Sequence, residues 1–168
     1  MKRTTKEIAG SVIGLAAVTG LNTWASNAFR GDEEFYASLD QPPWAPPGWV
    51  FAPVWAVNNL LNVYADLRMA SRSSGAARVG FGASQAAFWA TFFGFGVVYF
   101  RKRSPVLGFI ATAAGTVATA ASVGIAARVD KKAALALAPT ALWLAFATAV
   151  SGVVAKRNLG RDPYFAGR

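Results

Sequence analysis

Four long stretches of the sequence contain no charged residue, and they constrain the fold more than any other feature. They are residues 8–29, 79–100, 104–127 and 133–155. Each holds about 22 to 24 residues, which as an α-helix measure about 33 to 36 Å, enough to cross a hydrocarbon core of about 30 Å. A soluble domain of this size needs more surface charge than the 15% of charged residues found here. We therefore expect an integral, multi-pass membrane protein.

A fifth span is expected at about residues 46–67, although it is less apolar than the other four. Its polar side chains Asn59, Asn62 and Asp66 fall, together with Trp55, on one stripe of an α-helix. No alternation of period two is present, and lipid leaves the edge of an open sheet unsatisfied. The predicted fold is therefore an all-α membrane protein, a five-transmembrane-helix bundle.

The whole chain, residues 1–168, is expected to form a single domain. Outside the spans we expect a lid and a C-terminal tail. Residues 30–49 are the one long connector; it is acidic at first and then rich in Pro and Trp. Long loops in compact proteins often cover or bind ligands, so we expect this segment to be a lid. Residues 156–168 are expected to form a polar tail. The first span is too long for a typical signal-peptide core, and we interpret it as a retained helix.

The chain contains no Cys and no His. This excludes disulfides, zinc clusters, haem ligated by His or Cys, and nucleophile pairs built on these residues, so we predict no catalytic set, no metal site and no covalent cofactor. The formal net charge of +9 suggests nucleic acid in a soluble protein. Here the basic residues lie between apolar runs, where they anchor lipid headgroups. We expect the lipid bilayer as a partner and no nucleic acid.

Two of the expected spans carry features that allow more than one interpretation. Asn59 and Asn62 should face the bundle interior, where they line either a helix contact or a cavity, because an unpaired polar group is costly in lipid. Asp66 is nearer the membrane edge, where it is either solvated or paired with a base such as Arg128. In the last span, Ala147 is small among bulky neighbours, which leaves room for a ligand or lets another helix pack closely.

Two blocks rich in Trp and Pro are the most specific pattern in the chain. The first reads Tyr36-Ala-Ser-Leu-Asp-Gln-Pro-Pro-Trp44-Ala-Pro-Pro-Gly-Trp49-Val-Phe-Ala-Pro-Val-Trp55, and the second reads Pro139-Thr-Ala-Leu-Trp143-Leu-Ala-Phe146-Ala147-Thr148. They resemble the signature of the translocator protein family (TspO/MBR, tryptophan-rich sensory proteins). Gln85 stands between them, where the third helix of that family carries Gln. The resemblance covers the whole chain in length, span count and block order.

The resemblance implies a five-helix membrane protein, often dimeric, with a pocket closed by the first loop. Family members bind porphyrins such as protoporphyrin IX, isoquinoline and benzodiazepine drugs, and in some cases sterols. Residues 150–156 lack the Tyr of the family's sterol segment, so sterol binding is not expected. Flat π-faces suit a metal-free macrocycle, and bound lipid is a second candidate ligand. The ligand-binding residues that we carry over or add from the polar stripe are Tyr36, Trp44, Trp55, Asn59, Asn62, Trp143, Phe146 and Ala147.

Our leading hypothesis is an integral membrane receptor or carrier that binds a tetrapyrrole (porphyrin) or a similar flat hydrophobic ligand, with a regulatory or transport role. One alternative is an accessory structural subunit of a larger membrane complex, with or without a pigment. A second is a light-dependent porphyrin-degrading activity, attributed in bacterial family members to the tryptophans that match Trp55 and Trp143. We expect a bacterial membrane, and either a homodimer or a subunit of a larger membrane complex.

Overall fold

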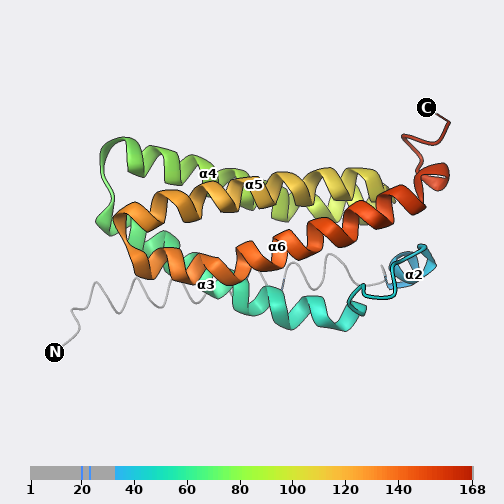
Figure 1. Cartoon of the computed structure of the whole chain (residues 1–168), viewed down its shortest axis with the longest axis horizontal. Helices are drawn as coiled ribbons and strands as arrows, with labels where there is room; N and C mark the ends of the chain where they lie inside the picture. The colour runs from blue at the N-terminus through green and yellow to red at the C-terminus, as the bar shows by residue number, and fades with distance from the viewer. Residues whose placement is uncertain (1–19, 21–22, 24–32, 168) are drawn as a thin grey trace.

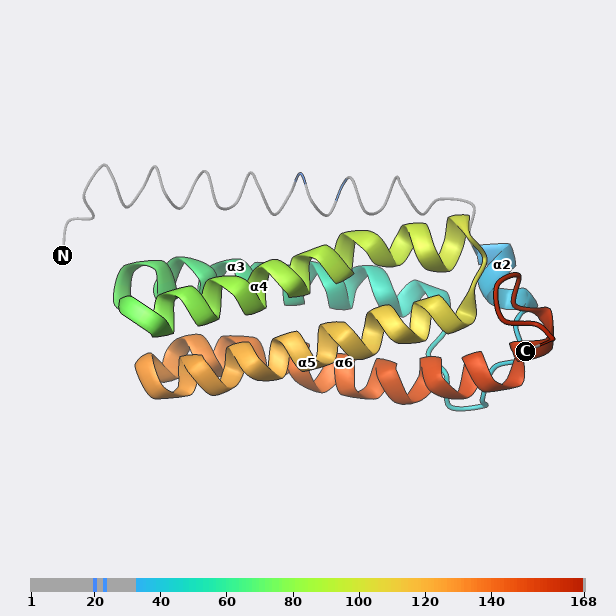
Figure 2. The same cartoon turned by 90° about the horizontal axis from the view of Figure 1, so that it is seen from above.

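The structure is a computed structural model that describes residues 33–167 together with Gly20 and Thr23. Four long helices lie side by side: α3 (Phe51–Arg72), α4 (Gly75–Gly96), α5 (Pro105–Val129) and α6 (Lys131–Arg157) (Figures 1 and 2). A short helix, α2 (Glu33–Ser38), lies near the C-terminal end of α6. Shorter turns are η1 (Gly48–Val50), the π-helical η2 (Val97–Arg101) and η3 (Leu159–Arg161). The described part of the chain is all-helical, without strands, and the predicted span 8–29 lies outside it except for Gly20 and Thr23.

Three of the described helical stretches are long and apolar enough to cross a membrane. They are Gly75–Arg101, Pro105–Val129 and Lys131–Arg157. They match the predicted spans 79–100, 104–127 and 133–155 to within about four residues at each end. Helix α3 is not among them, although it has 22 residues, because its polar stripe lowers its hydropathy.

Helix α3 is displaced from the predicted span 46–67 toward the C-terminus. It begins at Phe51 because the preceding Pro47 holds an extended backbone, with φ −64° and ψ 151°. Pro53 lies in the first turn of the helix, where its missing N–H has no helical partner to lose. The helix continues to Arg72 because Met69, beyond the predicted end, is fully buried in the bundle.

Helix α5 packs along α4 on one side and α6 on the other, and α3 packs mainly on α6. Glycines on α5 permit these close approaches. A Cβ added at Gly108 would lie 2.3 Å from the ring of Tyr99, and one at Gly115 would lie 2.9 Å from Oγ1 of Thr91. The two glycines therefore serve contacts inside the chain, between α5 and the α4–η2 stretch.

Asp130 joins the helices at the end of the bundle where α3 turns into α4. It is the N-cap of α6 and accepts from the backbone N–H groups of Lys132 and Ala133. Its Oδ2 is 2.7 Å from Arg68 and 3.2 Å from Arg72 on α3. Desolvation opposes ionisation of the Asp130 carboxyl, but the hydrogen bonds from Arg68 and from the two N–H groups outweigh it and lower its pKa. We call this end the turn end.

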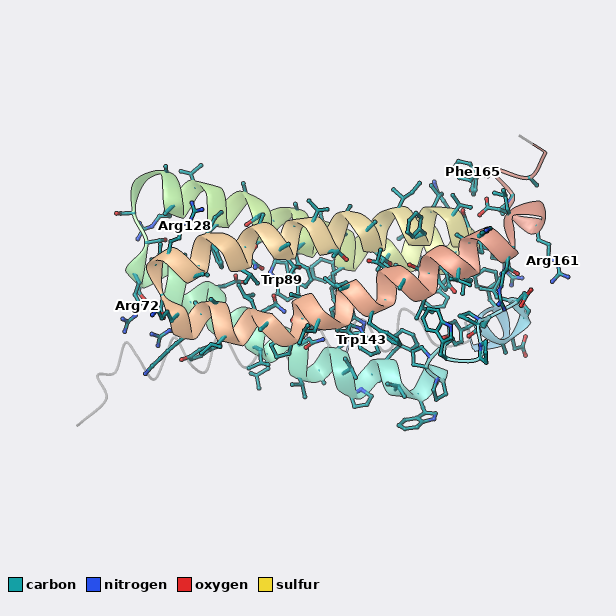
Figure 3. The ribbon with its side chains drawn as sticks, viewed as in Figure 1. Arg72, Trp89, Arg128, Trp143, Arg161 and Phe165 are labelled. Atoms are coloured by element: carbon teal, nitrogen blue, oxygen red, sulfur yellow. The ribbon has the colours of Figure 1, made fainter. Side chains whose placement is uncertain are left out.

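Asp162 performs a similar role at the opposite end, near α2, which we call the lid end. The described part of the predicted polar tail folds back here, and Asp162 is fully buried. Its Oδ2 accepts from the hydroxyl of Ser104 at 2.7 Å and from the N–H of Val106 at 3.1 Å. Ser104 in turn caps α5 by accepting from the N–H of Leu107. Figure 3 shows the two ends, with Arg72 and Arg128 at the turn end and Arg161 at the lid end.

Candidate functional site

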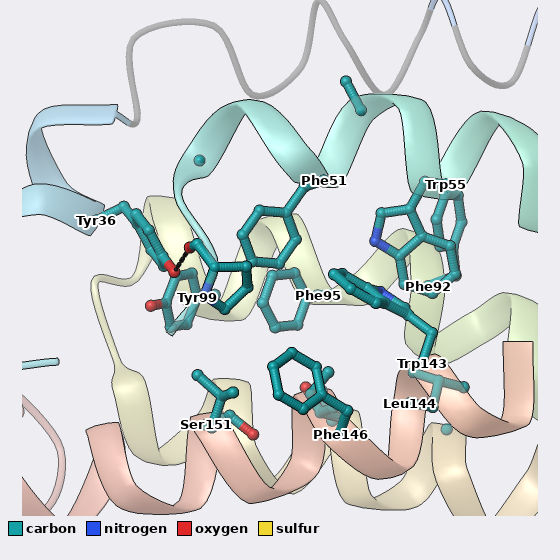
Figure 4. A pocket seen from close by; sticks show the side chains of 18 of the residues that line it. Tyr36, Phe51, Trp55, Phe92, Phe95, Tyr99, Trp143, Leu144, Phe146 and Ser151 are labelled. Carbon is teal, nitrogen blue, oxygen red and sulfur yellow. Dashed lines mark hydrogen bonds between the residues drawn. The ribbon is translucent and has the colours of Figure 1, made fainter. Parts of the chain in front are cut away.

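A cavity of about 920 Å³ lies between the four long helices in the half of the bundle nearest the lid end (Figure 4). This volume is within the range of about 300 to 1,000 Å³ typical of ligand pockets. None of the described lining residues is charged. Aromatic residues are the most numerous class in the described wall, namely Tyr36, Trp49, Phe51, Trp55, Phe88, Phe92, Phe95, Tyr99, Phe100, Trp143 and Phe146.

Two of the indoles in the wall come from different long helices, Trp55 from α3 and Trp143 from α6. The Trp55 ring meets the ring of Phe92 edge-on, with centroids 4.9 Å apart. The Trp143 ring lies 5.7 Å from that of Phe51 and 5.8 Å from that of Phe146. The Nε1 of Trp143 is buried and has no hydrogen-bond partner among the described residues. It is therefore a donor that a bound molecule can satisfy.

Small residues on α5 and α6 explain why the rings enclose space. Ala147 lies one turn after Trp143, and Ala111 and Gly115 contribute to the wall from α5. Pro139 lies one turn before Trp143 inside α6, where it removes one backbone N–H from the helix ladder. Because rigid rings face these small side chains, the wall leaves a chamber of ligand size.

The lid closes one side of the cavity with Tyr36, Pro46 and Trp49. The hydroxyl of Tyr36 donates to the carbonyl of Pro46 at 2.7 Å, as the dashed line in Figure 4 shows. The side-chain amide of Gln41 donates to the carbonyl of Tyr36, and the Tyr36 ring meets Phe51 edge-on at 5.7 Å. Burial raises the pKa of Tyr36, which keeps its hydroxyl protonated as a donor. Hydrogen bonds within the lid therefore connect Tyr36 to the proline-rich segment that follows it.

The same lid is attached to the C-terminal end of α6. Asn158 accepts from the N–H of Asp40 and donates to its carbonyl, both at 3.0 Å. Arg157 donates to the Asp40 carboxylate at 3.2 Å and to the carbonyl of Gln41 at 3.0 Å. Sequence reasoning missed Arg157 and Asn158, because it placed them in a polar tail and no local pattern pairs them with a segment over 100 residues away.

The structure brings together five of the eight residues predicted for ligand binding. Trp44 is outside the lining, but its ring packs against that of Phe146 with centroids 6.0 Å apart. The five residues in the lining are Tyr36, Trp55, Trp143, Phe146 and Ala147.

The two remaining predicted residues, Asn59 and Asn62, are fully buried in the bundle and are not in the described lining of the cavity. The Nδ2 of Asn62 donates to the carbonyl of Asn58 at 2.8 Å and to the hydroxyl of Thr140 on α6 at 2.7 Å. The sequence left two interpretations of the polar stripe open, a helix contact or a cavity wall. Asn62 forms a helix contact, between α3 and α6.

Asp66, which the sequence placed either in solvent or beside a base such as Arg128, has a different partner. Its Oδ2 accepts from the indole Nε1 of Trp89 on α4 at 3.2 Å. The bases Arg68 and Arg72 on the same helix pair with Asp130 instead. The bases nearest to Asp66 in the sequence therefore form ion pairs with Asp130, at the start of α6, and not with Asp66.

A model of the TspO/MBR family matches residues 9–156. The chain belongs to the TspO/MBR family. The matched region includes the lid, all four long helices except the last residue of α6, and most of the predicted first span. The chain is thus a membrane protein of this family, and its aromatic cavity lies within the matched region.

The relatives of this TspO/MBR chain come from bacteria and animals. It is 26% identical over 125 residues to the tryptophan-rich protein TspO of Chlorobaculum tepidum, covering 74% of this chain and 79% of that protein. It is 29% identical over 133 residues to the translocator protein of Ovis aries, covering 76% of each. It is 26% identical over 162 residues to the uncharacterized membrane protein YtaB of Bacillus subtilis, covering 92% of this chain and 99% of that protein.

Proposed function

We propose that this protein binds a tetrapyrrole, or a similar flat hydrophobic ligand, in the aromatic cavity, and acts as a receptor or carrier with a regulatory or transport role. The observation that carries the proposal is that Trp55 and Trp143 both line one chamber of about 920 Å³ beneath the lid. Aromatic faces stack on a flat ring system and stabilise it beyond simple burial of area.

The polar groups of the wall support a ligand that is mostly apolar but has acceptor atoms at its edge. Thr91, Thr112 and Ser151 line the cavity, but their hydroxyls donate to backbone carbonyls of their own helices, so the donor offered to such a ligand is the unpaired Nε1 of Trp143. The sequence supplies no His or Cys to ligate a metal at the centre of a macrocycle. The wall therefore favours a metal-free porphyrin.

Tryptophan-fluorescence titration of the purified protein with protoporphyrin IX tests this proposal. Trp55→Ala and Trp143→Ala each remove one stacking face, which is worth about 1 to 3 kcal/mol and raises Kd roughly 5- to 150-fold. Trp89→Phe is the matched control, because Trp89 is not in the described lining and its loss should leave Kd unchanged. Wild-type affinity in the double variant at Trp55 and Trp143 would contradict the proposal.

The same pair of indoles also supports a second candidate, a light-dependent porphyrin-degrading activity. Under illumination in air, binding alone shifts the porphyrin absorption band and leaves its area unchanged. Degradation bleaches the band in wild type, and Trp143→Phe, which keeps a ring but removes the indole, slows the bleaching. An unbleached band in wild type rejects this candidate and leaves the receptor or carrier role.

We also propose that the bundle has five membrane spans, with α3 as the second and residues 8–29 as the first. Five spans place the two chain ends on opposite sides of the membrane, and the absence of Cys makes single-cysteine labelling clean. Thr4→Cys and Gly167→Cys should react with an impermeant maleimide from opposite sides of oriented vesicles. Labelling from the same side indicates an even number of spans. The homodimer and the larger membrane complex stay predictions.

A further inference from the structure

A second cavity, of about 310 Å³, lies between α3 and α4 at the turn end of the bundle. It shares no described lining residue with the aromatic cavity and differs from it in chemistry. Its described wall consists of Asp66, Met69, Ala70, Ser73, Arg78, Phe81, Gly82 and Gln85. Carboxylate, amide and guanidinium groups thus line one small space at the edge of the helix bundle.

Two polar side chains of this wall have buried atoms without a hydrogen-bond partner among the described residues. Gln85 is only 5% exposed, and neither the oxygen nor the nitrogen of its amide has a hydrogen-bond partner among the described residues. Oδ1 of Asp66 is also buried and unpaired, while Oδ2 accepts from Trp89. A buried polar group without a partner is costly, and water cannot relieve the cost from the lipid side. These atoms are therefore suited to a polar ligand in the cavity.

The charges of the wall are separated along the helix axis. Arg78 is exposed in the first turn of α4, and its Nη2 donates to the carbonyl of Ala70 at 2.7 Å. Gln85 lies seven residues further along the same helix, which at about 1.5 Å per residue is roughly 10 Å deeper. The cavity thus has a cation at its rim, and a carboxylate and an amide further inside.

We propose that this cavity binds a small zwitterion, with a primary ammonium directed inward and a phosphate or carboxylate held near Arg78. The unpaired oxygens of Asp66 and Gln85 need N–H donors, which a primary ammonium supplies. The amide nitrogen of Gln85 needs an acceptor, which the ligand's anionic group or linker oxygen supplies. The carboxylate of Asp66 and the guanidinium of Arg78 then face charges of opposite sign.

Phosphoethanolamine has this chemistry, and it occurs both as a soluble molecule and as the headgroup of phosphatidylethanolamine. Phosphocholine is the matched comparison, because it has the same charges but its quaternary ammonium has no N–H to donate. The proposal therefore requires discrimination between two ligands that differ only in the groups attached to nitrogen.

The test is thermal unfolding of the full chain in phosphatidylcholine nanodiscs. Soluble phosphoethanolamine at about ten times its Kd should raise the Tm of wild type by roughly 3 to 6 °C, and phosphocholine should not. If the natural source is the lipid, replacing phosphatidylcholine by phosphatidylethanolamine produces the rise without added ligand. Either source supports the proposal. A Tm that responds to neither, or that responds equally to phosphocholine, overturns it.

Variants tie the response to the cavity. Gln85→Met keeps the length of the side chain and removes an amide that has no partner, so it should fold and lose the response; Asp66→Asn should lose it as well. Thr119→Val is the control, because Thr119 is fully buried, its hydroxyl has no hydrogen-bond partner in the described part of the chain, and it lies in neither described cavity wall. A response retained in both Gln85→Met and Asp66→Asn overturns the proposal.

Arg78→Gln tests whether the ligand binds as a zwitterion or as a simple cation. Loss of the guanidinium should weaken binding of phosphoethanolamine severalfold, because the anionic group then lacks its partner. Stronger binding in this variant would mean that Arg78 repels the ligand, and that outcome overturns the zwitterion.

Discussion

The same four helices enclose the large aromatic cavity at the lid end, which we call the hollow half, and pack more closely at the turn end, which we call the closed half, where a smaller cavity lies at the edge between α3 and α4. At the turn end Ala65, Ala126 and Ala133 are fully buried and pack with Met69 and Leu137, so the helices meet closely. At the lid end the helices carry rings that line about 920 Å³ of space. Alanines allow backbones to approach, whereas rigid rings keep them apart. Side-chain size therefore decides which half of one bundle holds the large cavity.

The two halves also differ in how their ends are fixed. The buried carboxylate of Asp130 gathers Arg68 and Arg72 at the turn end. At the lid end Asn158 holds the backbone of Asp40 by two amide hydrogen bonds, and an exposed ion pair to Arg157 adds to them. The ion pairs at the turn end thus share a buried carboxylate, while both partners of the ion pair at the lid end are exposed.

The largest expected effect is a cavity made in the closed half. Leu137→Ala removes a fully buried side chain whose space close-packed neighbours cannot refill, and we expect a loss of roughly 2 to 5 kcal/mol in the free energy of unfolding. Leu135→Ala is the control on the same helix: Leu135 is 72% exposed, and its loss should change stability by less than about 0.5 kcal/mol. Equal losses in denaturant titrations of the two variants would contradict the closed packing.

Substitutions that add side-chain volume to each half test whether one half is packed and the other hollow. Ala65→Leu forces extra atoms into the closed half and should cost about 1 to 3 kcal/mol of stability. Ala147→Leu places the same atoms at the wall of the aromatic cavity, so we expect little change in stability and weaker binding of protoporphyrin IX. Paired measurements of unfolding and Kd check this. A stability loss at Ala147 as large as that at Ala65 would argue against a hollow half.

Acid should loosen the turn end through Asp130. Its pKa is lower in the folded protein than in the unfolded chain, so its contribution is fully present above the unfolded value of about 3.9. The contribution is lost as pH falls through the lowered folded pKa. The Tm of wild type should therefore fall more steeply below about pH 4 than that of Asp130→Asn, which does not titrate there. Parallel pH profiles would show that the carboxylate contributes nothing.

The smallest effect is expected at the exposed ion pair of the lid. Asp40→Asn should cost only about 0.2 to 1 kcal/mol, because solvent screens the contact between Asp40 and Arg157. The loss should shrink further in high salt. A double-variant cycle with Arg157→Gln measures the pair directly, and a coupling above about 1 kcal/mol would mean that the pair matters more to the lid than its exposure suggests.

Much of the candidate site was predictable because its residues lie in two local blocks. Trp55 and Trp143 were placed on the second and last spans by motif and periodicity, and both line the cavity. The partner of Asp66 was not predictable, because the sequence contains several bases near it and the indole of Trp89 lies on another helix. The start of α3 was placed five residues early, because the apolar pattern continues through a proline run that cannot be helical.

The sequence by itself determined the membrane-length helices, since a charge-free run of sufficient length is a local property that needs no partner. It also determined that the protein has no Cys or His chemistry. The tertiary structure alone decided which half of the bundle is hollow and which carboxylates hold its ends. Asp162 bonds to Ser104, and Asp40 to Asn158, across 58 and 118 residues. Such pairs form because the packed helices bring their ends together, and no spacing along the chain encodes that distance.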